Sequence, residues 1–512
     1  MPEPGRRSRL FLLSTAFGML LTAAGPAEPR HGRLAYSSPL AWPLLLTQTQ
    51  RSEPGKTDSA DVPDGARIVL FDPSTAQSAK SLTLDFFAAA WPDVSFDASR
   101  FLFVARRASS DPPAVWEFSL TDGATRRITD AVPCRRAIYL SPFYSLELDG
   151  PEDRIALLAR PPGESLDAIF TGRRDGSDIR RITFSPRGID DLLQLTDGRL
   201  LFSMPSTDTQ HLFTVHMDGA DLFPFAGIYD PPARQTMPCE TADANVLFLE
   251  SPITGGVCGK GLSVNPSGAC IARTTTLATV SAVRSLRTRR SLMSLSVGVF
   301  RSLSPLPDGR VLVSYRPSDD MTFGVYLLDP HNGGPPTQVF DDPDCDELGA
   351  VTLAPRAEPA GRSSGIEQKT RTGQLYCLNA YLSDPADGRP VPSGAIDRVR
   401  IVRDPSNATS ASSASQVLME AKVEPDGSFF AEVPAETPLR VETLDETGRV
   451  LRAMRTPMWV MPGEERGCIG CHEDRELTPP NRHVLALRKP PQRAAPIPSR
   501  PQEHASQEKD TP

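Results

Sequence analysis

The sequence predicts an all-β protein: a β-propeller of six or seven blades, then a small β-sandwich and a short C-terminal segment. Short β-rich runs recur along most of the chain, and each follows a turn that contains Asp or Gly. The 512 residues include 51 Pro and 36 Gly, which suits many short strands and tight turns and disfavours long helices. The length allows two or three domains, each with its own core.

The N-terminus has the features of a signal peptide, which we place at residues 1–27. Arg6, Arg7 and Arg9 precede an apolar run over residues 10–21, and small residues follow. A membrane anchor needs about 20 apolar residues, so cleavage is favoured over anchoring. There is no second apolar span in the sequence. We therefore expect export to the periplasm and no membrane span in the mature form. The Pro/Ser/Gly-rich residues 28–62 are interpreted as a linker.

The predicted propeller covers residues 63–355, where two elements alternate. One is a strand-length run led by Asp, at residues 97–104, 153–158, 197–203, 243–249 and 308–315. The other is a hairpin with Asp-Gly at its turn, at residues 122–123, 175–176 and 218–219. The Asp-led runs recur every 45 to 65 residues or so, which is blade-sized spacing. This alternation resembles the TolB-type, WD40-like propeller repeat.

The remainder of the chain divides by composition. Residues 356–370 are predicted to be a hinge, and residues 371–462 a β-sandwich with turns at Asp426-Gly427 and Thr447-Gly448. Residues 463–487 hold a Cys-x-x-Cys-His motif. Residues 488–512 are rich in Lys, Arg, Pro and Gln, so we expect a disordered tail.

The motif at Cys468, Cys471 and His472 predicts covalent attachment of one c-type haem. Two thiols on one turn can add to the two vinyl groups of a porphyrin, and the adjacent imidazole can bind the iron. A thioredoxin-like pair would need a βαβ context, and a zinc site would need a second CxxC, and neither is present. Residues 463–487 are therefore a predicted c-type haem-binding segment.

A second iron ligand is not determined by the sequence. His483, Met461 and Met458 are candidates near the motif. Each has a plain alternative, because His483 can be a solvent-exposed side chain and the methionines can pack in a core. No second ligand at all, which leaves an open iron, is an equal expectation.

The remaining cysteines and the net charge limit which disulfides, partners and metal sites can be expected. Cys258 and Cys270 flank a Gly-rich loop and are the best candidates for a disulfide, with buried thiols as an equally weighted alternative. The net charge of −8, without an aromatic-interleaved basic face, argues against a nucleic-acid partner. The acidic residues 341–347 are better explained as a solvated turn than as a calcium site.

Three segments resemble the hydrazine synthase alpha subunit family: residues 458–473 with 479–482, residues 426–440, and residues 313–329. The resemblance implies a propeller, a middle β domain and a c-type haem docked between them. In that family the motif histidine faces a zinc ion and a tyrosine four residues later binds the iron. It thus implies a zinc-ligand role for His472, while Glu476 stands where the tyrosine would be. Zinc is therefore a second candidate cofactor.

Three functions follow from these features. The first is a haem-dependent oxidoreductase that acts on a small, nitrogenous substrate. The second is an electron-transfer cytochrome that docks a partner, and the third is a propeller scaffold with structural haem. We expect a redox role, with another redox protein or subunit as partner. Since the sequence holds one CxxCH, and ends where the synthase continues into a further haem-bearing domain, hydrazine synthesis itself is disfavoured.

Overall fold

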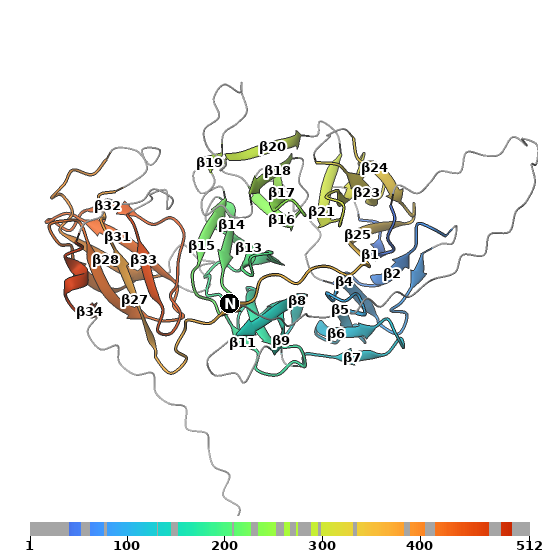
Figure 1. The fold of residues 1–512 in the computed structure, drawn as a ribbon, viewed down its shortest axis with the longest axis horizontal. Coiled ribbons are helices and arrows are strands. Elements are labelled where there is room, and N and C mark those ends of the chain that lie inside the picture. The colour runs from blue at the N-terminus through green and yellow to red at the C-terminus, as the bar shows by residue number, and fades with distance from the viewer. Residues whose placement is uncertain are drawn as a thin grey trace, which may run out of the picture. The chain divides into compact units, whose positions relative to one another are not determined.

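A computed structural model describes residues 40–52, 62–75, 79–130, 132–144, 152–206, 209–226, 234–251, 261–266, 273–274, 288–294, 298–330, 335–382, 390–404, 415–470 and 483–493. The predicted signal peptide lies outside these ranges. The described residues form almost entirely β structure, as Figure 1 shows, and this confirms the predicted fold class. Among them, no helix is long and apolar enough to cross a membrane.

The strands of the N-terminal region form six blades within the described residues, and the strands of each blade pair antiparallel except β19 with β20. The innermost strand of each blade contacts that of the next, in the ring β25, β4, β8, β12, β16, β21 and back to β25. This closed ring is a β-propeller. From the innermost strand outward, the blades are β25 (Cys345–Thr352), β1 (Leu44–Gln50), β2 (Arg67–Phe71), β3 (Lys80–Ser81); β4 (Ala88–Val94), β5 (Arg100–Arg106), β6 (Ala114–Ser119), β7 (Thr125–Arg127); β8 (Cys134–Tyr144), β9 (Glu152–Ala159), β10 (Ala168–Arg173), β11 (Arg180–Arg181); β12 (Asp190–Gln194), β13 (Leu200–Pro205), β14 (Gln210–Val215), β15 (Phe223–Ala226); β16 (Arg234–Glu240), β17 (Asn245–Ser251), β18 (Gly261–Pro266), β20 (Thr288–Ser294), β19 (Arg273–Thr274); and β21 (Val299–Pro305), β22 (Val311–Arg316), β23 (Gly324–Leu328), β24 (Thr337–Phe340).

Strand β1 closes the ring, which corrects the prediction of a linker over residues 28–62. It lies between β2 and β25 and pairs antiparallel with both, so the first and last segments of the propeller share one blade. Its first six residues are buried. Leu44, Leu45 and Leu46 supply the apolar side chains that make this strand part of the core.

The blade that closes the ring contains buried acidic side chains. Asp346 Oδ1 accepts a hydrogen bond from Phe323 N (2.9 Å), and Oδ2 accepts one from Ser52 N (2.8 Å). Gln48 Nε2 donates to Glu347 Oε1 (3.0 Å) across the β1–β25 pair. Part of the acidic stretch predicted as a solvated turn is therefore inside the closing blade. Burial raises the pKa of Glu347 to about 8.

Through Glu347, the stability of the propeller is expected to fall as pH rises from about 4.5 to about 8 and to level off above that. The pKa of Glu347 in the folded state lies above its ordinary value of 4.5, so its contribution is complete below pH 4.5 and is lost as pH rises through about 8. Thermal unfolding from pH 5 to 9 should show this decline, and Glu347→Gln should reduce it. Glu358→Gln, which removes an exposed carboxyl, is the control and should leave the slope unchanged. Equal slopes in the wild type and Glu347→Gln would contradict the assignment.

The segment predicted as a hinge, residues 356–370, is tied to the propeller. Arg356 N donates to Phe96 O (2.9 Å), and Ala360 N donates to Thr196 O (2.8 Å). Strand β26 (Arg362–Ser363) pairs with β8, and Ser364 Oγ donates to Asp218 Oδ2 (2.8 Å). The prediction of a hinge is therefore corrected to a strap bonded to several blades, because its backbone amides and polar side chains find partners there.

The C-terminal domain is a sandwich of two four-stranded sheets. Apolar side chains from both sheets belong to one buried cluster, which is the core of the sandwich. One sheet is β33 (Glu465–Cys468), β27 (Thr372–Cys377), β30 (Phe429–Pro434) and β34 (Gln492–Arg493), and the other is β29 (Gln416–Lys422), β28 (Arg398–Arg403), β31 (Leu439–Leu444) and β32 (Val450–Ala453).

The first residues of the predicted disordered tail belong to this sandwich, which corrects that boundary. A 3₁₀ turn covers Ala486–Arg488, and β34 pairs parallel with β30. The Gln492 side chain accepts a bond from Lys422 N (2.8 Å) and donates one to Lys422 O (3.0 Å). The Gln492 amide thus takes the place of a neighbouring strand for the backbone of Lys422 in β29. The composition of the tail does not indicate this contact.

Candidate functional site

Cys468, the first thiol of the predicted haem motif, is the last residue of β33. This strand pairs parallel with β27, in register from Gln374 opposite Glu465 to Cys377 opposite Cys468. Leu378 N donates to Cys468 O (2.9 Å), and Asn379 N donates to Ile469 O (3.1 Å). The backbone on which the motif starts is therefore held by a sheet. Cys471, His472 and Glu476 lie outside the described residues.

Two glycines let the chain pass close to its neighbours at this point. A Cβ on Gly467 would lie 2.6 Å from the Tyr376 ring. A Cβ on Gly470, between the two motif cysteines, would lie 2.5 Å from the Leu382 carbonyl oxygen. The contact at Gly470 is with backbone, so this position requires glycine, whereas a side chain at position 467 would have to displace the Tyr376 ring. Cys468 itself is partly exposed and packs against the apolar cluster of the sandwich.

His483 lies near the same end of the sandwich. Ala380 N donates to Gly427 O (2.8 Å), next to the bond from Asn379 to Ile469, and Leu485 N donates to Asp426 Oδ2 (2.9 Å). These bonds bring the segment that follows His483 and the start of the motif to one turn-rich edge. The His483 side chain is exposed. Its imidazole is thus a candidate iron ligand that no core contact occupies.

The two candidate methionines have packing roles instead. Met461 is 2% exposed, and a Cβ on Gly219 would lie 2.9 Å from its sulfur. Met458 is buried, and its backbone exchanges two hydrogen bonds with Leu439 (2.8 and 2.7 Å). Both side chains belong to the apolar core that the sandwich shares with blade β12–β15. The structure thus favours the packing alternative for both.

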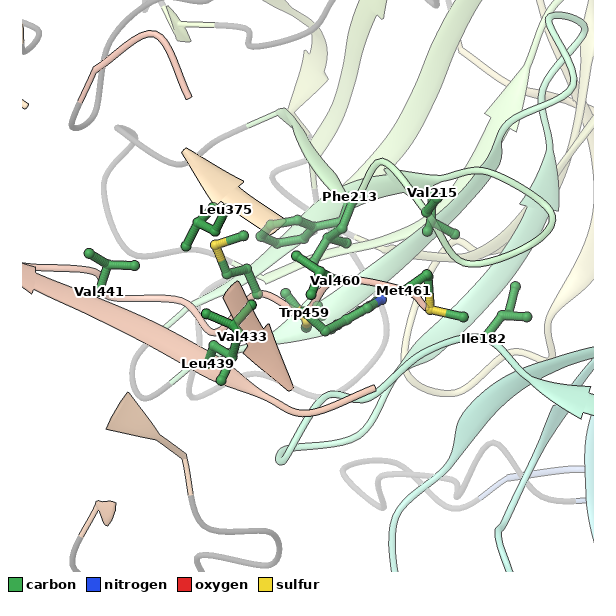
Figure 2. Packing of buried hydrophobic residues seen from close by; sticks show 14 of the residues in the cluster. Ile182, Phe213, Val215, Leu375, Val433, Leu439, Val441, Trp459, Val460 and Met461 are labelled. Atoms are coloured by element: carbon green, nitrogen blue, oxygen red, sulfur yellow. The ribbon is translucent and has the colours of Figure 1, made fainter. Parts of the chain in front are cut away.

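Trp459 lies at the centre of this shared core. Figure 2 shows Trp459 and Met461 between propeller residues that include Phe213 and Ile182 and sandwich residues that include Leu375, Val433 and Leu439. Trp459 is fully buried, and its Nε1 donates to Gly219 O (3.2 Å). The strand that leads to the motif is therefore anchored on the β14–β15 turn of the propeller.

A buried ion pair beside the motif contacts the same turn. Glu464 Oε1 accepts a bond from Asp221 N (3.0 Å), and Oε2 accepts one from Met461 N (2.6 Å). Arg466 donates to Leu222 O, and its guanidinium lies 4.7 Å from the centre of the Phe223 ring. Arg466 Nη1 and Glu464 Oε1 are 3.6 Å apart. Burial raises the pKa of Glu464, and Arg466 opposes this effect.

Neither Glu464 nor Arg466 was predicted as a site residue. Their signal is the alternation at the start of β33, where Glu464, just before the strand, and Arg466 are buried and Glu465 between them is exposed. Charges at inward positions of a strand indicate a buried partner.

The other cysteines and the metal prediction are tested only in part. Cys134 and Cys239 are buried thiols, which agrees with the buried-thiol alternative, and burial raises the pKa of Cys134 to about 12 and also raises that of Cys239. Cys258 and Cys270 lie outside the described residues. Within the described ranges, no three His, Cys, Asp or Glu side chains are grouped to hold a metal ion.

Part of the chain matches a known protein family. Residues 378–473 match the family model of the hydrazine synthase alpha subunit middle domain. The hydrazine synthase subunit alpha of Kuenenia stuttgartiensis is 23% identical over 550 aligned positions, which cover 84% of this chain. The chain spans 65% of that relative's length. The predicted resemblance is therefore confirmed.

The fold is shared with the same protein. The solved structure of Kuenenia stuttgartiensis hydrazine synthase superposes with a TM-score of 0.74 at 20% identity, covering 88% of this chain and 71% of that chain. TolB from Acinetobacter baumannii aligns at 11% identity with a TM-score of 0.41, over 61% of this chain and 67% of that chain.

Proposed function

We propose that this chain is an exported redox protein that carries one c-type haem on Cys468 and Cys471. One observation supports this most directly: Cys468 is a partly exposed residue that ends a strand held in register against β27, with Gly467 and Gly470 keeping the backbone close. A reactive thiol for covalent attachment needs access as well as a fixed position. The residues present thus fit a thioether-linked haem, which when bound supplies one-electron chemistry at iron.

The role of each protein group follows from its position. Cys468 and Cys471 would hold the porphyrin, and His472 would bind the iron or, as the family resemblance implies, a zinc ion. The ion pair of Glu464 and Arg466 and the indole of Trp459 would fix the distance between the motif and the propeller. Since Met458 and Met461 are occupied by packing, His483 and an open position remain the leading choices for the sixth ligand, and Glu476 stays a candidate outside the described residues.

A redox role in nitrogen metabolism is supported by the likeness to a hydrazine synthase subunit. We propose oxidoreductase activity on a small nitrogenous substrate and association with another subunit, since the named relative is itself a subunit. Export is supported by the signal-like N-terminus and by the compartment in which c-type haem is attached.

The test is the intact mass of the protein from a host that attaches c-type haem. The expected product lacks the signal peptide and carries one added haem. Cys468→Ser with Cys471→Ser should remove the added mass, whereas Cys134→Ser, at a buried thiol away from the motif, should keep it. A mature wild-type mass without haem would overturn the proposal.

Absorption spectra, oxidised and reduced, then separate the functions. A high-spin iron that binds carbon monoxide or nitric oxide supports substrate chemistry. A six-coordinate low-spin iron that becomes high-spin in His483→Ala supports electron transfer with His483 as ligand.

A further inference from the structure

Cys377 lies opposite the first haem-motif cysteine in the sheet. It is the last residue of β27, and the parallel register of β27 with β33 pairs it with Cys468. Cys377 is 1% exposed, and Cys468 packs against the apolar cluster that contains Cys377. The two side chains therefore point to the same face of the sheet.

This placement meets the requirement for a disulfide. Paired residues on adjacent strands have Cα atoms about 4.8 Å apart. A disulfide needs Cα atoms about 4.4 to 6.8 Å apart, with side chains directed to one side. Cys377 and Cys468 thus need only side-chain rotation to bond, because the sheet already supplies the backbone geometry.

We propose that Cys377 and Cys468 form a disulfide in the haem-free protein and that this bond controls haem attachment. The oxidant is the disulfide of an exported thiol oxidoreductase. One Sγ–Sγ bond forms in this chain, the two thiols lose their protons, and the oxidant's disulfide is reduced to two thiols. A dithiol reductant reverses the exchange and returns Cys468 as a thiol. The effect on attachment rests on the proposed function, whereas the disulfide itself does not.

The bond would act as a control because Cys468 cannot serve both partners. A thioether to haem needs the Cys468 thiol, so oxidation with Cys377 removes one of the two attachment points. The competing disulfide joins Cys468 to Cys471 within the motif. Unlike that pair, Cys377 and Cys468 are held together by sheet hydrogen bonds on both sides, including Leu378 N to Cys468 O (2.9 Å).

The first experiment maps disulfides in the full chain, exported in a host without cytochrome c maturation. Thiols are alkylated in denaturant without reductant, and the digest is analysed by mass spectrometry. The expected product is a peptide with Cys377 linked to a peptide with Cys468. Alkylated Cys377, whatever the state of Cys468 and Cys471, would overturn the inference.

The second experiment measures haem occupancy in a maturing host when reductant is limiting. Cys377→Ser and Cys377→Ala should each raise the haem-bearing fraction several-fold. Cys134→Ser, at an equally buried thiol in the propeller, should not. Unchanged occupancy in both Cys377 variants with wild-type folding would overturn the control of attachment. If neither the wild type nor any variant carries haem although the linked peptide forms, the proposed function fails and the disulfide stands.

Discussion

Replacing Trp459 by alanine is expected to destabilise the protein by roughly 3–5 kcal/mol, the range for losing a fully buried large aromatic side chain. Trp459 is 0% exposed and lies in the core shared by the sandwich and blade β12–β15. The change also removes the donor to Gly219 O. Urea unfolding followed by circular dichroism measures the loss, since tryptophan fluorescence would change with the substitution itself.

Two controls separate the causes. Trp459→Phe keeps most of the volume and loses the hydrogen bond, so its effect should be clearly smaller. Leu84→Ala, at a side chain that is 77% exposed, should change the stability by less than about 0.5 kcal/mol. If Trp459→Ala unfolds at the same urea concentration as the wild type, the indole is not a central contact between the two parts.

Replacing Glu464 by alanine is expected to give the second large loss of stability, because it leaves Arg466 buried without its counter-charge. Glu464→Ala also deprives Asp221 N and Met461 N of their acceptor. Loss of one partner of a buried pair costs about 3–5 kcal/mol. The free energy of urea unfolding of Glu464→Ala should fall by an amount in that range.

A double-mutant cycle tests the pair directly. Arg466→Met alone should also destabilise, because it leaves the Glu464 carboxylate buried. The combination Glu464→Leu with Arg466→Met should cost far less than the sum of its single changes. Additive costs would show that the two side chains do not interact. Glu465→Leu, at the exposed neighbouring position on β33, is the matched control and should be nearly neutral.

Local pattern predicted the repeating parts of the fold well. The Asp-Gly pairs at 175–176 and 218–219 are turns, with Gly176 and Gly219 at φ values of 90° and 92°. Positive φ is a property of the residue itself, so a turn of this kind can be recognised from neighbours in the sequence. The CxxCH motif, which predicts haem attachment, is visible for the same reason, since Cys468 and Cys471 are close in sequence.

Pairings between distant segments were not predictable in the same way. Residues 44–50 were predicted to be part of a linker, because the local sequence does not indicate that β25, a distant segment, pairs with them. The partners of Glu464 and Arg466 come from the β14–β15 turn, and their inward direction depends on which face of β33 the sandwich covers.

The sequence was sufficient for the all-β class and the blade repeat, and it contains the CxxCH motif on which the haem prediction depends, because each of these features depends on residues near one another in the chain. The tertiary structure alone decided which strand closes the propeller, which methionines are buried, and which cysteine faces Cys468. Those outcomes depend on strand register and on shared burial of distant side chains, and a shift of one residue would reverse each side chain's direction.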